Sequence, residues 1–141
     1  MENINALDEI HKGACMGTDA IDCILDKIND KNFKAEVERE YDNYQDIEKI
    51  IEEIYPKYND GNPHETGVMT KAMTSMHIEM KTLTDESDSK LTELLLQGVN
   101  MGVIEGRRIL NKKEINKEVE DIVSKYVTMQ EESVEALKKY L

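Results

Sequence analysis

Apolar residues return every three or four positions along four long stretches of the chain, which is the spacing that gives an α-helix one apolar face. The first stretch carries Ile4, Leu7, Ile10, Ala14, Ile21, Ile24, Leu25 and Ile28. The second carries Phe33, Val37, Tyr41, Tyr44, Ile47, Ile51, Ile54, Tyr55 and Tyr58. The other two lie at 91–110 and 115–141. Each apolar face needs a partner, so the pattern predicts an all-α four-helix bundle.

Polar segments separate the predicted helices. Two are short enough to make tight turns, at 29–32 and 111–113, and a third at 59–63 ends the second helix. A longer stretch carries a stripe of Met69, Met73, Met76 and Met80, which predicts an extra short helix. Residues 84–88 then offer good N-cap chemistry. We expect one domain over 1–141, with hairpin one at 4–59, a crossover at 60–84 and hairpin two at 85–141.

The most informative pattern is an internal repeat at an offset of 85 residues. The run Lys12-Gly13-Ala14-Cys15-Met16-Gly17 is similar to Gln97-Gly98-Val99-Asn100-Met101-Gly102. At the same offset Ile24-Leu25 matches Ile109-Leu110, Tyr41 matches Tyr126, and Gln45 matches Gln130. The repeat predicts two copies of one helical hairpin, packed around a pseudo-two-fold axis.

Each copy places two glycines one helical turn apart. A glycine inside a helix costs about 1 kcal/mol relative to alanine, so a compensating contact is expected. We expect the first helices of the two hairpins to approach each other closely there; the alternative is room for a ligand against bare backbone. The repeated tyrosines are expected inside the bundle, with the glutamine amides as hydrogen-bond partners. A ligand site at the axis would be bordered by Gly13, Gly17, Gly98, Gly102, Tyr41, Gln45, Tyr126 and Gln130.

Two pseudo-symmetric hairpins joined by a long crossover resemble the ferritin-like superfamily, especially its small bacterial members. This topological resemblance covers nearly the whole chain. It implies a di-iron site with one Glu from the first helix of each hairpin and Glu-x-x-His from the second. The chain has no Glu-x-x-His, and its histidines, His11, His64 and His77, lie outside the second helices. The repeat instead puts neutral Tyr and Gln where ligands are expected, and these bind iron weakly. We therefore expect the fold without a bound cofactor.

An unusual metal site is an alternative. Asp8, His11 and Cys15 share one helix face and could form half of such a site. Glu40 and Glu105 fall close to the apolar stripes of their helices, where a pair of carboxyls could share a proton or bind a cation. The competing interpretation places His11 at the core edge, Cys15 as a small packed hydrophobe, and both glutamates at stripe margins.

Composition restricts the partners. The 141 residues are 39% hydrophobic and 34% charged, with a net charge of −12. Such a surface repels phosphates and anionic lipids, so we expect neither nucleic acid nor membrane as a partner. Cys15 and Cys23 would be about 12 Å apart along one helix, too far for a disulfide. The N-terminus also lacks a signal-peptide pattern, so we expect a reduced, cytoplasmic protein.

These observations favour a binding or assembly module without enzymatic activity. We expect it to self-associate or to bind a protein partner, through the Met-rich segment or an exposed bundle face. A metal-binding protein with an unusual site and a small-molecule binder at the pseudo-two-fold axis are the alternatives.

Overall fold

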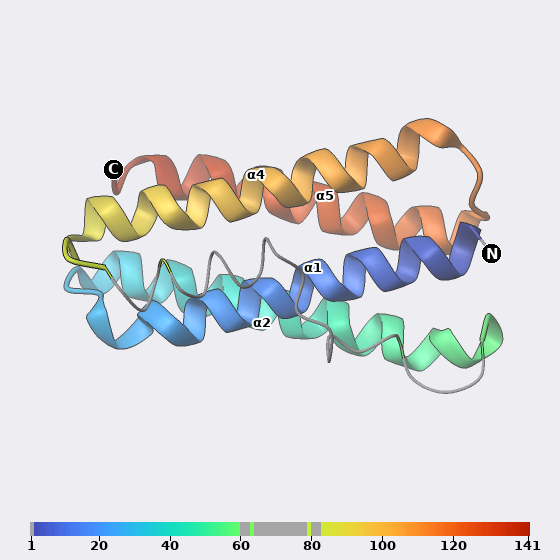
Figure 1. Ribbon diagram of the computed structural model, residues 1–141, viewed down its shortest axis with the longest axis horizontal. Helices are drawn as coiled ribbons and strands as arrows, with labels where there is room; N and C mark the ends of the chain where they lie inside the picture. The colour runs from blue at the N-terminus through green and yellow to red at the C-terminus, as the bar shows by residue number, and fades with distance from the viewer. Residues whose placement is uncertain (1, 60–62, 64–78, 80–82) are drawn as a thin grey trace.

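The computed structural model describes residues 2–59, 63, 79 and 83–141, and the described part contains helices and no strand (Figure 1). Its long helices are α1 (Glu2–Ile24), α2 (Lys31–Ile54), α4 (Asp88–Lys112) and α5 (Lys117–Lys138). Short 3₁₀ turns, η1 (Leu25–Lys27) and η2 (Tyr55–Lys57), extend α1 and α2. The predicted all-α four-helix class is therefore confirmed.

The four helices lie side by side along one long axis (Figure 1). Helices α1 and α2 run antiparallel, as do α4 and α5, and α2 ends at the opposite end of the bundle from the start of α4. The direction of the chain is therefore up, down, down, up. The predicted extra helix and the Met stripe of the crossover lie outside the described residues.

Hydrogen bonds tie the ends of the two hairpins together. At one end, Asp88 at the start of α4 accepts two hydrogen bonds of 2.9 Å, from the backbone N–H groups of Asn29 and Asp30 in the α1–α2 connection. At the other end, the backbone N–H of Asn116 donates to Oδ1 of Asn3 over 2.9 Å. These hydrogen bonds fix the position of the two hairpins relative to each other along the long axis of the bundle.

Side-chain caps explain where three helices begin. Asp30, Ser87 and Asn116 accept hydrogen bonds from the backbone N–H groups of Phe33, Lys90 and Val119, over 2.8, 3.2 and 3.0 Å. Each bond satisfies a donor that the first helical turn leaves free. The N-cap predicted within 84–88 is thus Ser87. The first short connection, at 28–30, falls close to the predicted turn at 29–32, whereas α4 continues through Asn111 and Lys112 and the second connection falls at 113–116.

The buried faces of the two hairpins repeat each other. Positions in α1 and α4 correspond at an offset of 85: Ala6, Leu7, Ile10 and Ala14 with Leu91, Thr92, Leu95 and Val99. Positions in α2 and α5 correspond at an offset of 86: Phe33, Val37, Tyr44, Ile47 and Ile51 with Val119, Val123, Gln130, Ser133 and Leu137. The second hairpin therefore has one more residue between its helices than the first.

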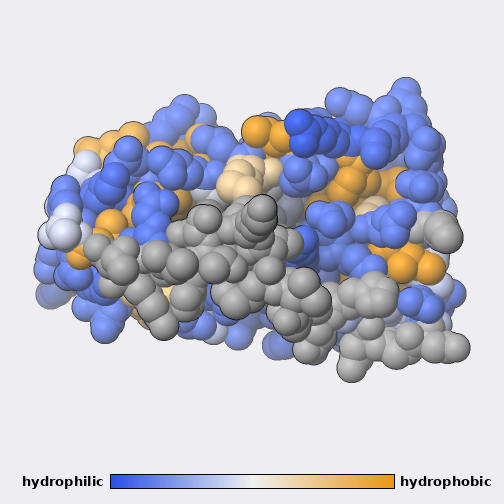
Figure 2. Space-filling model, viewed as in Figure 1, coloured by the Kyte–Doolittle hydropathy of each residue, from blue (hydrophilic) through white to orange (hydrophobic). Residues whose placement is uncertain are grey.

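Figure 2 shows a mainly hydrophilic face with hydrophobic side chains in separate patches. In the part of the chain that the structure describes, no helix has both the length and the apolar character needed to cross a bilayer. Cys15 and Cys23 lie on the same helix and are not joined in a disulfide, as expected.

Candidate functional site

A cavity of about 260 Å³ lies among the four helices, at the middle of the bundle. Its apolar wall consists of Ile10, Met16, Ala20, Ile21, Leu94, Leu95, Val99 and Met101. Gly13, Gly17, Gly98 and Gly102 contribute bare backbone. The polar wall consists of Glu9, Lys12, Glu40, Tyr44, Glu105, Tyr126 and Gln130. The structure therefore brings together all four repeated glycines, as the small-molecule alternative requires.

Three of these glycines make room for side chains from α2 and α5. A Cβ at Gly13 would lie 2.5 Å from the hydroxyl oxygen of Tyr126, and one at Gly17 would lie 2.5 Å from Cε2 of Tyr44. At Gly102 it would lie 2.5 Å from Nε2 of Gln130. Tyrosine and glutamine side chains from α2 and α5 therefore occupy the space that a Cβ would fill at these three glycines. Helices α1 and α4 also contact each other.

A hydrogen-bonded chain of buried side chains forms the deep wall. The Tyr44 hydroxyl donates to Oε1 of Gln130 over 2.8 Å, and Nε2 of Gln130 donates to the Tyr126 hydroxyl oxygen over 3.2 Å. All three side chains are buried. Burial raises the pKa of Tyr126 to about 12 and that of Tyr44 well above its usual value, so both hydroxyls stay protonated. The proton of the Tyr126 hydroxyl can thus be donated to an acceptor on its cavity side.

The tyrosine that joins Tyr126 is Tyr44, and not Tyr41 as the repeat predicts. Tyr41 is only half-buried, and its hydroxyl is hydrogen-bonded to Asp22. Gln45 is half-buried too, and neither residue lines the cavity. The extra residue in the second hairpin is the reason, because it shifts the buried register of α5 by one position. Glu40 then corresponds to Tyr126, and Tyr44 corresponds to Gln130.

Glu40 is the most buried carboxyl group of the cavity wall. It is 3% exposed and lines the cavity, and its Oε2 has no hydrogen-bond partner among the described residues. Ser133 is hydrogen-bonded to the carboxyl group. Burial, and to a smaller extent the charge of Glu36, raise the pKa of Glu40 from 4.5 to about 8. An empty cavity at neutral pH therefore holds Glu40 mainly as the neutral acid.

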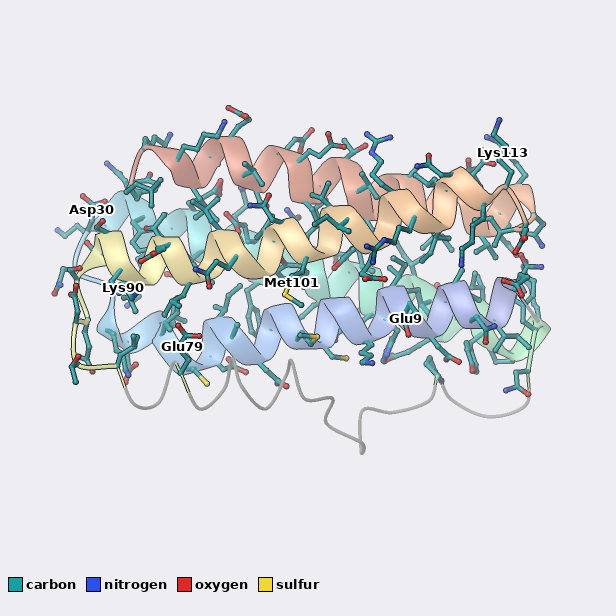
Figure 3. All side chains as sticks on the ribbon, turned by 45° about the horizontal axis from the view of Figure 1, so that its top comes forward. Glu9, Asp30, Glu79, Lys90, Met101 and Lys113 are labelled. Atoms are coloured by element: carbon teal, nitrogen blue, oxygen red, sulfur yellow. The ribbon has the colours of Figure 1, made fainter. Side chains whose placement is uncertain are left out.

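The opposite side of the cavity reaches the surface between α1 and α4. Figure 3 shows Met101 between these helices and Glu9 on α1. Met101 is 41% exposed, and Glu9 and Glu105 are exposed as well. Glu105 also forms an ion pair with Arg108 over 3.2 Å. The cavity thus runs from an acidic rim to a buried polar wall.

The residues of the alternative metal sites fall in two different places. Glu40 and Glu105 line the cavity, whereas His11 lies against Glu52 of α2, with Nε2 and Oε1 3.1 Å apart. Cys15 Sγ lies 3.8 Å from Nδ1 of His11. Asp8 is half-buried on α1. Among residues 2–59, 63, 79 and 83–141, no three His, Cys, Asp or Glu side chains are grouped to hold a metal ion.

Cys15 is a poor nucleophile in this setting. Burial raises the pKa of its thiol to about 12, and the negative charges of Glu48, Asp19 and Glu52 add to the effect. Only the thiolate is nucleophilic, so the nearby imidazole of His11 does not produce a reactive cysteine. The expectation that Cys15 acts as a small packed side chain agrees with these contacts.

Several residues of the cavity wall were not predicted from the sequence, including Tyr44, Met16 and Met101. Met16 and Met101 occupy the same place in the repeated Gly-x-x-Met-Gly motif, and both line the cavity. That repeat was the available signal, because a methionine between two glycines of one helix face must lie at the edge of the same surface. Nothing in the sequence indicates that the Glu40 carboxyl group is buried, beyond its position close to the apolar stripe of its helix.

Comparison with known proteins adds no further information on the chemistry. No family model, no curated protein and no solved structure matches the chain. Its function therefore has to be inferred from the chemistry of the cavity.

Proposed function

We propose that this protein is a small-molecule binding protein, with its site in the cavity among α1, α2, α4 and α5. The observation that carries the proposal is the cavity itself: about 260 Å³ lined by bare glycine backbone, apolar side chains and a few buried polar groups. Ligand sites in proteins have this composition, in which apolar walls supply affinity and few polar groups fix orientation.

The volume limits the size of the ligand. An apolar cavity of about 150 Å³ holds a benzene molecule, so this one suits a compact ligand of one or two rings, or an aliphatic chain of similar bulk. The pair of hydroxyls at Tyr44 and Tyr126 is already bonded through Gln130. The deep wall is thus organised before a ligand arrives, which lowers the entropy lost on binding.

We further propose a ferritin-like arrangement that arose by duplication of a hairpin. The up, down, down, up order and the matching buried positions of the two hairpins support this proposal. The wall follows the same pattern, since Gly13, Met16 and Gly17 of α1 have their counterparts in Gly98, Met101 and Gly102 of α4. Gln45 is half-buried and Gln130 is an uncharged amide, so the deep wall favours an organic ligand over iron.

Binding can be tested with benzyl alcohol and benzylamine, two probes with the same ring and different polar groups. Backbone amide chemical shifts of the intact protein, followed by NMR during titration, should change saturably at Gly13, Gly17 and Gly102 with at least one probe. Ala20→Leu, which fills the cavity wall, should abolish the changes. Ala35→Leu is the matched control, because Ala35 is exposed on α2 and does not line the cavity. The proposal would be overturned if the two variants bound the probes equally well, or if the probes bound to none of the three proteins.

Self-association through an exposed face has less support. The large hydrophobic side chains exposed in the described part are Met101, Ile104 and Leu141. Met101 also belongs to the cavity rim. Self-association and a protein partner stay predictions of the sequence, since the Met-rich stretch on which they depend lies outside the described residues.

A further inference from the structure

The unpaired carboxyl oxygen of Glu40 points to the chemistry of the ligand. A buried polar atom without a partner destabilises a fold by roughly the free energy of removing it from water, so folded proteins seldom retain one without a use. Oε2 of Glu40 is such an atom, on a side chain that is 3% exposed and lines the cavity. Ser133 is hydrogen-bonded to the carboxyl group, and within the described part of the chain Oε2 has no partner.

The other charges of the cavity favour a cation. Its wall contains three carboxyl groups, those of Glu9, Glu40 and Glu105, and one ammonium group, that of Lys12. The chain as a whole carries a net charge of −12, which attracts cations and repels anions over a longer range. The buried rings of Tyr44 and Tyr126 add π-faces of the kind that attract organic cations.

We infer that the ligand carries a protonated amine, which pairs with the carboxyl group of Glu40, on a compact apolar body that lies against the apolar wall formed by α1 and α4. This inference rests on the proposed function and specifies its ligand class. Met16 and Met101, one from each copy of the repeated motif, flank the apolar body. Their unbranched side chains adapt to different shapes.

Binding of such a cation releases a proton. Glu40, with its pKa of about 8, is mainly neutral in the empty cavity at pH 7 and must become a carboxylate to pair with an ammonium group. One proton therefore leaves Glu40 for solvent, and the ammonium keeps its own proton. Affinity should rise about tenfold per pH unit below pH 8 and level off above it.

Other polar and charged groups lie near Glu40 or share the cavity wall with it. These groups are Glu9 and Lys12 from α1, Glu36, Arg39 and Tyr44 from α2, Glu105 from α4, and Ser133 and Tyr126 from α5.

The test compares benzylamine with benzyl alcohol by calorimetry on the full chain, at pH 6, 7 and 8. The wild type should bind benzylamine at least about tenfold more tightly than the alcohol at pH 8, with release of close to one proton at pH 6, measured in buffers of different ionisation enthalpy. Glu40→Gln should lose this preference and the pH dependence. Glu53→Gln, an exposed position on the same helix outside the cavity, should keep both.

Each other outcome overturns the inference in a distinct way. Equal affinity for the two probes would refute the amine class and leave the small-molecule proposal standing. Tighter binding of benzyl alcohol at pH 6 than at pH 8 would show that Glu40 acts as a neutral donor. An unchanged preference in Glu40→Gln would place the cation elsewhere. Binding of neither probe would overturn the proposed function, and the inference with it.

Discussion

The hydroxyl of Tyr44 donates a hydrogen bond of 2.8 Å to Oε1 of Gln130, which lies 86 positions later on the other hairpin. Both side chains are buried, and the two residues occupy corresponding positions in the buried registers of α2 and α5. The bond therefore joins the two hairpins at the deep wall of the cavity.

Tyr44→Phe should lower the free energy of unfolding by about 1–3 kcal/mol, because it leaves the Gln130 carbonyl buried without its donor. Gln130→Leu should have a similar effect. In the double variant the losses should be less than additive, by about 1 kcal/mol, since the same bond is removed only once. Urea unfolding of the four proteins measures this coupling. Additive losses would mean that the hydrogen bond contributes nothing of its own.

Glu40→Gln should make stability less dependent on pH. The pKa of Glu40 is raised from 4.5 to about 8, so between these values the folded protein holds a proton that the unfolded protein releases. The free energy of unfolding therefore falls as the pH rises through this window and is constant above it. At pH 9 the variant should be more stable than the wild type by about 2 kcal/mol or more, and the difference should shrink toward pH 4.

Thermal unfolding from pH 4 to 9 checks this prediction. Glu53→Gln, at an exposed position of the same helix, should follow the wild-type curve. A Glu40→Gln curve parallel to that of the wild type would show that folding does not shift the pKa of Glu40.

Gly17→Ala should destabilise the protein, although alanine is the better helix former by about 1 kcal/mol. The new Cβ would lie 2.5–2.7 Å from three ring atoms of Tyr44, and such overpacking costs about 1–3 kcal/mol. In a Tyr44→Leu background the same substitution should become stabilising, because the clash is removed. On Gly17→Ala the urea midpoint should therefore fall in the wild type and rise in the Tyr44→Leu background. A rise in the wild type would show that the Tyr44 ring moves aside freely.

Cys15 should react slowly with iodoacetamide while the protein is folded. A thiol with a pKa of about 12 holds very little thiolate at pH 8, so the rate should be about 100-fold or more below that of the unfolded chain. The Cys23→Ser variant isolates this signal, and mass spectrometry measures the rate with and without urea. Equal rates in the two conditions would contradict the buried environment of the thiol.

The sequence determined the helices and their connections. Apolar spacing located each long helix, and two of the predicted polar breaks contain the caps Asp30 and Ser87, whereas the third cap, Asn116, lies three residues beyond the break predicted at 111–113. These features depend on residues that are close in sequence, because a cap acts on backbone donors two or three residues away. The repeat of glycines was visible for the same reason, and it identified the part of α1 and α4 that lines the cavity.

Only the tertiary structure decided which side chains meet the glycines. Tyr41 and Tyr44 are three residues apart, about 60° around the helix, so both belong to one broad apolar face and the periodicity cannot choose between them. The rotation of α2 is set by the packing of Phe33, Val37 and Ile47, and it turns Tyr44 toward Gln130. The same rotation buries Glu40 and leaves its Oε2 without a partner among the described residues, because burial is a property of all four packed helices and not of any one segment.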